Sequence, residues 1–140
     1  MPDIPDRLYI DKDDRQLYDE LDLEDMLKLR EKGGRRTRKE QFILAMATGL
    51  KNGVKRPLVT KEGIFFVKDL RSEDEALIGA VALHDSGSVE VLGSKQEMYR
   101  IAEEYARAGI RLISDMLRSV PNGTFDKCLE RELFEMMNEH

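Results

Sequence analysis

Residues 94–119 read SKQEMYRIAEEYARAGIRLISDMLRS, the longest stretch of the chain with a single hydrophobic periodicity. Its apolar residues recur at every third or fourth position, which places them on one face of a helix. Ser94 followed by Glu97 is the capping-box pattern that opens a helix. The stretch therefore predicts a helix to about Ser119, with an inward stripe of Met98, Ile101, Ala102, Tyr105, Ala108, Gly109, Leu112, Ile113, Met116 and Leu117.

A second helix is predicted upstream by the same two signals. Thr37 and Glu40 form a capping box before residues 42–50, which are apolar nearly all round and therefore predict a central helix. Asn52-Gly53 is expected to end this helix, because both residues tolerate the left-handed conformation.

The remaining elements are shorter. Ser72 and Glu75 repeat the capping-box pattern before an apolar helix, in which Gly79 and Ala80 would let another helix approach closely. Weaker patterns predict helices over residues 12–21, 23–32 and 124–138, extended segments over residues 1–10 and 89–92, and a β-hairpin with strands 58–60 and 64–67. We therefore expect a mainly α protein: one compact helical domain over residues 1–140, with about five to six helices and a small β-hairpin.

Composition limits the class of protein. With 41% hydrophobic and 36% charged residues, the chain is globular rather than disordered. Cys128 is the only cysteine, so no intramolecular disulfide can form, and we interpret it as a core side chain of the last helix. The first residues lack the pattern of a signal peptide, and no apolar run has the length of a membrane span. We therefore expect a cytoplasmic protein that does not enter a membrane.

Candidate catalytic and metal-binding residues are few. His84-Asp85-Ser86 holds the residue types of a hydrolase triad, but triad members converge from separate elements. One cysteine and two histidines are too few for a structural zinc site within a monomer.

Four aspartates near the N-terminus are spaced like the ligands of a calcium loop, namely Asp11, Asp13, Asp19 and Asp22. Arg15 and Gln16 stand where that loop needs an oxygen ligand and a glycine, so we interpret these aspartates as a solvated acidic helix start. We therefore expect no enzyme activity, no metal and no cofactor. A deep pocket lined by carboxylates such as Glu103, Glu104 and Asp115 would reopen the enzyme hypothesis.

Charge is distributed very unevenly. Residues 1–27 carry 10 acids and 3 bases, residues 28–56 carry 10 bases and 2 acids, and residues 57–140 carry 16 acids and 10 bases. The middle block contains a basic joint over residues 28–39 that leads into a helix N-terminus, a combination that can present cations and backbone amides to phosphate. The predicted nucleic-acid contacts are Arg35, Arg36, Arg38, Lys39, Lys51, Lys55 and Arg56.

Two other interpretations stay open. The basic block can instead neutralise the acidic N-terminal block within the same molecule. The protein can also be an interaction module or homodimer that uses residues 98–119, or the last helix, with Phe134 as an exposed anchor.

Three segments together resemble a known family. They are FILAMATGLKNG at residues 42–53 with Lys55-Arg56-Pro57-Leu58 after it, ALIGAVAL at residues 76–83, and IAEEYARAGI at residues 101–110. In this order they are similar to a family of small prokaryotic proteins found alongside DNA phosphorothioate modification and restriction systems of the Dnd type. The resemblance covers about residues 37–137. It implies an accessory role in DNA modification or defence, without catalytic residues to carry over, and it strengthens the expectation that the basic stretch meets DNA or a DNA-bound partner.

Overall fold

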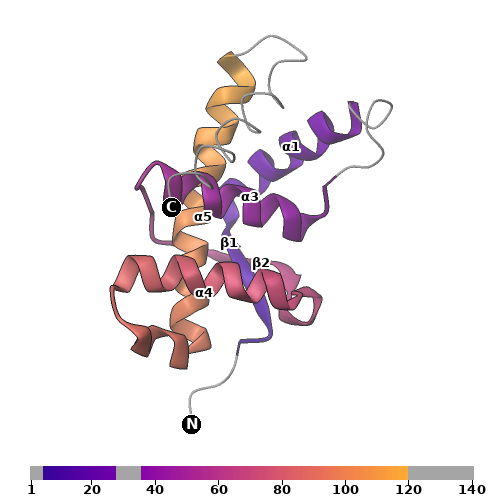
Figure 1. Ribbon diagram of the computed structural model, residues 1–140. Helices are drawn as coiled ribbons and strands as arrows, with labels where there is room; N and C mark the ends of the chain where they lie inside the picture. Colours follow the sequence, from indigo (N-terminus) through magenta and orange to yellow (C-terminus); the bar gives the residue numbers. More distant parts are fainter. Residues whose placement is uncertain (1–4, 28–35, 120–140) are drawn as a thin grey trace.

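The computed structural model describes residues 5–27 and 36–119 of the 140-residue chain (Figure 1). The described helices are α1 (Arg15–Leu27), α3 (Arg38–Lys51), α4 (Ser72–Ser86) and α5 (Lys95–Ser119). The strands are β1 (Arg7–Asp11) and β2 (Lys61–Phe66), and short 3₁₀ turns cover Lys12–Asp14, Val67–Asp69 and Val89–Gly93. The mainly α fold with a small two-stranded antiparallel sheet is confirmed.

Helix α5 is the central element, and α3 crosses it in backbone contact. A Cβ atom placed on Gly109 would lie 1.7 Å from the carbonyl oxygen of Ala45, and one on Gly49 would lie 2.1 Å from that of Tyr105. The close helix approach was expected at Gly79, but a Cβ atom there would meet only side-chain ends at 3.4 and 3.5 Å. The tight crossing therefore belongs to α3 and α5.

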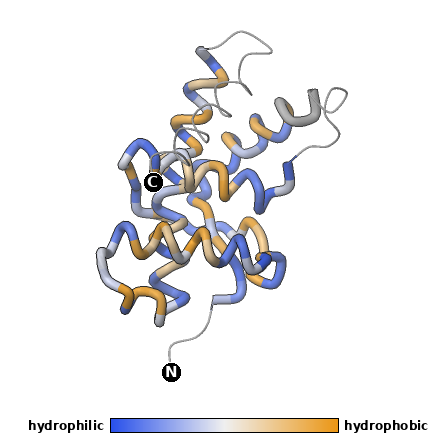
Figure 2. The backbone as a smooth tube through the Cα atoms, in the orientation of Figure 1, coloured by the Kyte–Doolittle hydropathy of each residue, from blue (hydrophilic) through white to orange (hydrophobic). Residues whose placement is uncertain are grey.

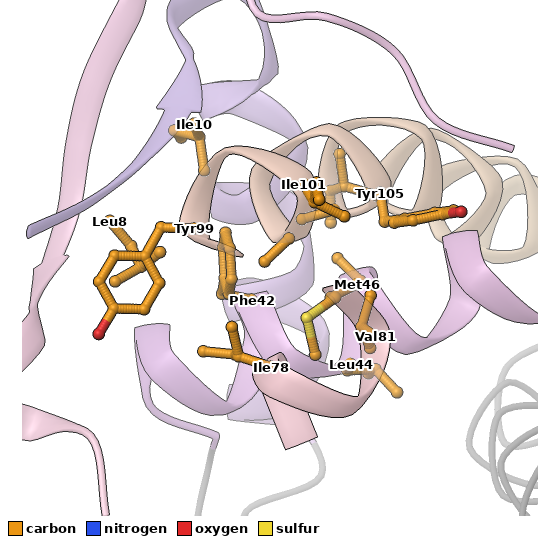
Figure 3. Packing of buried hydrophobic residues seen from close by; sticks show 14 of the residues in the cluster. Leu8, Ile10, Phe42, Leu44, Met46, Ile78, Val81, Tyr99, Ile101 and Tyr105 are labelled. Atoms are coloured by element: carbon orange, nitrogen blue, oxygen red, sulfur yellow. The ribbon is translucent and has the colours of Figure 1, made fainter. Parts of the chain in front are cut away.

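The core gathers side chains from every described helix and from both strands. Phe42 packs edge-on against Phe65, with ring centroids 5.4 Å apart. Figure 3 shows Phe42, Ile78 and Ile101 meeting in this core. The largest fully buried apolar side chains are Leu8, Tyr18, Leu21, Phe42, Met46, Ile78, Ile101, Ile110 and Ile113.

The small sheet joins parts of the chain that are far apart in sequence. β1 pairs antiparallel with β2, so that Arg7 faces Phe66 and Asp11 faces Lys61. The predicted first strand at residues 58–60 is wrong, because the partner of β2 comes from the segment expected to be only an extended lead-in. Glu103 of α5 accepts a hydrogen bond from the Tyr9 amide at 2.9 Å, which ties β1 to α5.

The predicted helix starts are partly confirmed. Both halves of the Thr37–Glu40 capping box are present, and Ser94 accepts from the Glu97 amide. The N-cap of α4 is Arg71, one residue earlier than predicted, because Asp74, rather than Glu75, accepts a hydrogen bond from the N-cap amide.

Two other predicted elements differ from the structure, and a third lies outside the described residues. Helix α1 runs without a break past residue 22, and residues 89–93 form a 3₁₀ turn rather than an extended segment. The predicted last helix, with Cys128 and Phe134, lies outside the described residues, as does most of the basic joint. Within residues 5–27 and 36–119, no helix combines the length and apolar character that crossing a bilayer requires.

Candidate functional site

The N-terminal end of α3 carries two of the predicted cations, and Arg38 connects α3 to α1. Its Nη2 atom lies 2.7 Å from Asp19 Oδ1 and 3.2 Å from Asp22 Oδ2. Its Nη1 atom donates to the backbone carbonyl of Tyr18 at 3.0 Å. Because Asp19 and Asp22 belong to the acidic N-terminal block, this contact is the intramolecular neutralisation that the sequence left open.

Lys39, one residue later, connects α3 to α4. Its Nζ atom lies 2.8 Å from Asp74 Oδ2, and both side chains are largely buried. Burial works to raise the pKa of Asp74, but the hydrogen bonds from Lys39 and from the Arg71 amide outweigh it, so the pKa is lowered. Asp74 therefore stays ionised, and it holds Lys39 as it caps α4.

Lys55 forms a second connection at the opposite end of α3 and α4. Its Nζ atom lies 2.9 Å from Asp85 Oδ1, which also accepts from the Tyr105 hydroxyl at 2.7 Å. The pKa of Asp85 is lowered, because these hydrogen bonds outweigh the effect of burial. Helices α3 and α4 thus run in the same direction and are tied at both ends (Figure 1).

The exit loop, residues 52–57, follows α3 and is exposed along its whole length. Hydrogen bonds nevertheless fix its course: the Val54 amide donates to Gly49 O, the Arg56 amide donates to Glu104 O, and Arg107 donates to Pro57 O. Within the described residues, no carboxylate pairs with the Arg56 guanidinium, so a rigid loop presents an unpaired cation to solvent.

The seven predicted cations do not form one cluster. Arg36, Arg38 and Lys39 lie at one end of α3, whereas Lys51, Lys55 and Arg56 lie at the other, about 20 Å away by helical rise. Arg36 and Lys51 each take part in at least one further noncovalent contact. Arg35 lies outside the described residues.

A pocket of about 570 Å³ opens where the N-termini of α3 and α4 meet. Its charged lining comprises three bases and four acids, so the local charge does not favour an anion. These residues are Arg38, Lys39, Arg71, Glu40, Asp69, Glu73 and Asp74. Acids therefore outnumber bases in the lining of this pocket.

A buried ionic cluster at the start of the chain was missed by the sequence interpretation. Asp11 and Asp14 are buried rather than solvated, and Arg107 of α5 lies between them, 3.2 Å from Asp11 Oδ2 and 3.4 Å from Asp14 Oδ2. Arg111 lies 3.0 Å from Asp14 Oδ1. The expectation of a solvated acidic helix start is wrong for Asp11, which is buried against Arg107 of the distant α5.

The pKa values of the two carboxylates in this cluster are shifted in opposite directions. Burial favours the neutral form of Asp11, but amide hydrogen bonds, from Val59 above all, lower its pKa. Burial raises the pKa of Asp14, and Arg111 and Arg107 offset only part of that effect. The cluster fastens the end of β1 to both α5 and the loop before β2.

A small cleft of about 110 Å³ lies between the exit loop and β2. Pro57, Leu58, Lys61, Arg100, Glu103 and Glu104 line it. Two carboxylates proposed for an enzyme pocket are present, but Asp115 is exposed elsewhere, and the volume is well below the 300 Å³ or more of typical ligand sites. Burial raises the pKa of Glu103 to about 7, although the Tyr9 amide stabilises its charged form.

The raised pKa of Glu103 predicts a pH-dependent stability. The folded protein holds this proton up to a pH of about 7, compared with an ordinary value of 4.5, so the stabilisation is complete below pH 4.5 and is lost as the pH rises through 7. Glu103→Gln keeps an oxygen that can accept from Tyr9 but cannot ionise. Between pH 5 and 8, we expect the wild-type free energy of unfolding to fall by about 2.5 kcal/mol more than that of the variant. Urea denaturation at both pH values measures this, and parallel profiles would contradict it.

Comparison with known proteins adds one match. A family model described as "DNA sulphur modification system-associated protein 4" matches residues 7–139. No curated protein matches the chain, and no solved structure does. The match spans nearly the whole chain, including β1, the exit loop and the buried ionic cluster.

Proposed function

Because the chain belongs to the DNA sulphur modification system-associated protein 4 family, and so is an accessory protein of such a system, we propose that it acts in the cytoplasm by binding rather than catalysis. Its ligand is the DNA backbone or a DNA-bound partner. Of the predicted contacts, we propose that Lys51 at the end of α3 and Lys55 and Arg56 in the exit loop are the principal ones. Arg35, Arg36, Arg38 and Lys39 are secondary contacts.

The observation that carries this proposal is the unpaired guanidinium of Arg56 on a rigid, exposed loop. Phosphate contacts come mainly from such arginines and lysines, and a fixed backbone reduces the entropy lost on binding. The neighbouring pair Lys55–Asp85 is accessible, with 40% of the Lys55 side chain exposed. Its partner Asp85 is only 15% exposed, so a phosphate would approach Lys55 from the solvent side of the pair.

Lys39 and Arg38 are less available to a ligand. The Lys39 side chain is only 18% exposed and pairs with an equally buried Asp74. Arg38 contacts two carboxylates and a backbone carbonyl at once. Both residues would have to leave these partners before they could meet DNA, which is why we place them second.

A second candidate function is supported by the outer surface of α4. Ala76, Leu77 and Ala80 are exposed on this helix, and Val89 and Leu92 are 70% and 44% exposed on the turn that follows. Figure 2 shows the hydrophobic residues of α4 and of this turn. Such a surface fits a protein partner or a second copy of the chain. Light scattering that shows a monomer would remove the homodimer from this alternative.

DNA binding through the exit loop can be tested with a fluorescein-labelled duplex of about 20 base pairs. We expect anisotropy to show binding at low salt, and we expect Arg56→Ala to weaken it several-fold. The slope of log affinity against log salt should become shallower by about 0.9, the value for one lost phosphate contact.

Arg118→Ala is the matched control, because it removes the same charge from an exposed side chain near the far end of α5. We expect it to leave the slope unchanged. Absence of binding by the wild-type protein, or an equal effect of both substitutions, would overturn the proposed DNA contact.

A further inference from the structure

The sheet presents an outer face that none of the predicted sites includes. Alternation along β1 and the register with β2 place Arg7, Tyr9, Lys61 and Phe66 on this face, while Leu8 and Phe65 point into the core. Asp11 follows the same alternation, but its side chain is buried and pairs with Arg107. We call Arg7, Tyr9, Lys61 and Phe66, together with Lys68 just beyond β2, the outer sheet face. It combines two aromatic rings with three cations.

Each aromatic ring of this face lies beneath a cation. The Arg7 guanidinium carbon lies 5.0 Å from the Phe66 ring centroid, and Lys68 Nζ lies 5.4 Å from it. Lys61 Nζ lies 5.8 Å from the Tyr9 ring centroid. The cations thus gather at two neighbouring rings of one face, and Phe66 is 45% exposed.

The charge of this face is poorly neutralised by the protein itself. Within the described residues, no carboxylate forms an ion pair with Lys61 or Lys68. Arg7 has only the exposed Asp6, at 3.5 Å. This differs from the N-terminal end of α3, where acids outnumber bases. An anionic ligand on this face would therefore have few carboxylates to displace.

A hollow beside one ring leaves room for a flat group. The surface over Gly63, the cross-strand partner of Tyr9, is already covered by Arg7, whose Cδ would lie 2.8 Å from a Cβ atom on Gly63. Beside Phe66, an open hollow of about 460 Å³ is lined by Pro5, Asp6, Phe66, Val67 and Lys68. A planar ring can enter this hollow against the side of Phe66.

We propose that the outer sheet face binds a short single-stranded segment of nucleic acid, with bases stacked on Phe66 and Tyr9 and phosphates held by Arg7, Lys61 and Lys68. Aromatic platforms bordered by cations are how proteins hold unpaired strands without reading their sequence. The inference deepens the proposed function, since it rests on nucleic acid as the ligand.

The two nucleic-acid surfaces adjoin one another. Lys61 of the outer sheet face also lines the small cleft, whose other side is formed by Pro57 and Leu58, directly after Arg56. A strand that leaves a duplex at the exit loop would therefore reach the outer sheet face next. Duplex bases are paired and stacked inside the helix, so only an opened strand can use the rings.

The test compares a labelled 12-nucleotide oligothymidylate with a duplex of the same length. We expect the wild-type protein to bind the single strand, and we expect Phe66→Ala to weaken this binding about tenfold while leaving duplex binding unchanged. Leu92→Ala is the matched control, because Leu92 is equally exposed, at 44%, and lies outside the face. Thermal melting of each variant confirms that its fold is retained.

Stacking itself can be observed directly. The chain contains no tryptophan, so Phe66→Trp introduces a single reporter. Its emission should be quenched by oligothymidylate, whereas that of Leu92→Trp should not. Equal losses for Phe66→Ala and Leu92→Ala, or an unquenched Phe66→Trp, would overturn the inference even if Arg56-dependent duplex binding is found. If instead polyglutamate binds this face as strongly as oligothymidylate, and Phe66→Leu does not weaken that binding, the face would be assigned to an acidic protein. If neither duplex nor single strand binds, both proposals fail.

Discussion

Replacing Gly109 with alanine is expected to lower the free energy of unfolding by at least about 3 kcal/mol, at or beyond the upper end of ordinary overpacking. The new methyl group would lie 1.7 Å from Ala45 O and 2.8 Å from the Gly49 amide nitrogen. These are backbone atoms of α3, so no rotamer change can relieve the clash. The two helices would have to separate, and the core between them would lose its packing.

Two other glycines provide a graded comparison. Gly93→Ala meets no atom within 4 Å and should change stability by less than about 1 kcal/mol. At Gly79, the new methyl group would meet only the ends of the Leu92 and Met98 side chains. Because alanine also has a helix propensity about 1 kcal/mol more favourable than that of glycine, Gly79→Ala should be tolerated. Urea denaturation of the three variants measures this order. A Gly109→Ala protein as stable as Gly93→Ala would show that α3 and α5 do not touch.

Arg107→Met is expected to destabilise the protein by about 3–5 kcal/mol, the usual consequence of removing one partner from a buried ion pair. Methionine preserves much of the side-chain volume but leaves Asp11 and Asp14 buried beside one another, with only Arg111 opposite Asp14. The Pro57 carbonyl would lose its donor as well. The loss should be smaller at pH 5 than at pH 8, because a carboxylate without its cation can take up a proton.

An exposed ion pair serves as the control for this second variant. Arg15→Met breaks the pair between Arg15 and Glu62. Because the Arg15 side chain is 51% exposed, the loss of stability should be less than about 1 kcal/mol. Chemical denaturation of both variants at pH 5 and 8 provides the comparison. Equal and pH-independent losses would mean that the cluster is open to water.

Local signals in the sequence predicted the helices well. The capping box at Thr37 and the periodicity of residues 94–119 depend on neighbours three or four positions apart, and the structure has both helices where they were expected. The strand pairing was not predictable in the same way. β2 could have paired with residues 58–60 nearby, but it pairs with β1, 50 or more residues upstream, where Leu8 and Phe65 pack into the core.

The candidate site was predictable only as a set of residue types. The sequence identified the cations at both ends of α3, but their acidic partners Asp74 and Asp85 lie 30 or more residues away on α4. For the same reason, Asp11 was interpreted as solvated, because its partner Arg107 comes from the distant helix α5. Tyr9 and Phe66 lie outside the basic stretch, and only the pairing of β1 with β2 brings them to one face.

The contact between Gly49 and Gly109 also limits how this sequence can drift during evolution. A clash with a side chain can be compensated by a smaller neighbour, but a clash with a backbone carbonyl cannot, because every residue carries the same backbone. Any larger residue at the crossing would require a rigid shift of α3, and with it a shift of Lys39, Lys55 and the exit loop. Surface charges can therefore change one at a time, whereas the crossing point has no neutral single step away from glycine.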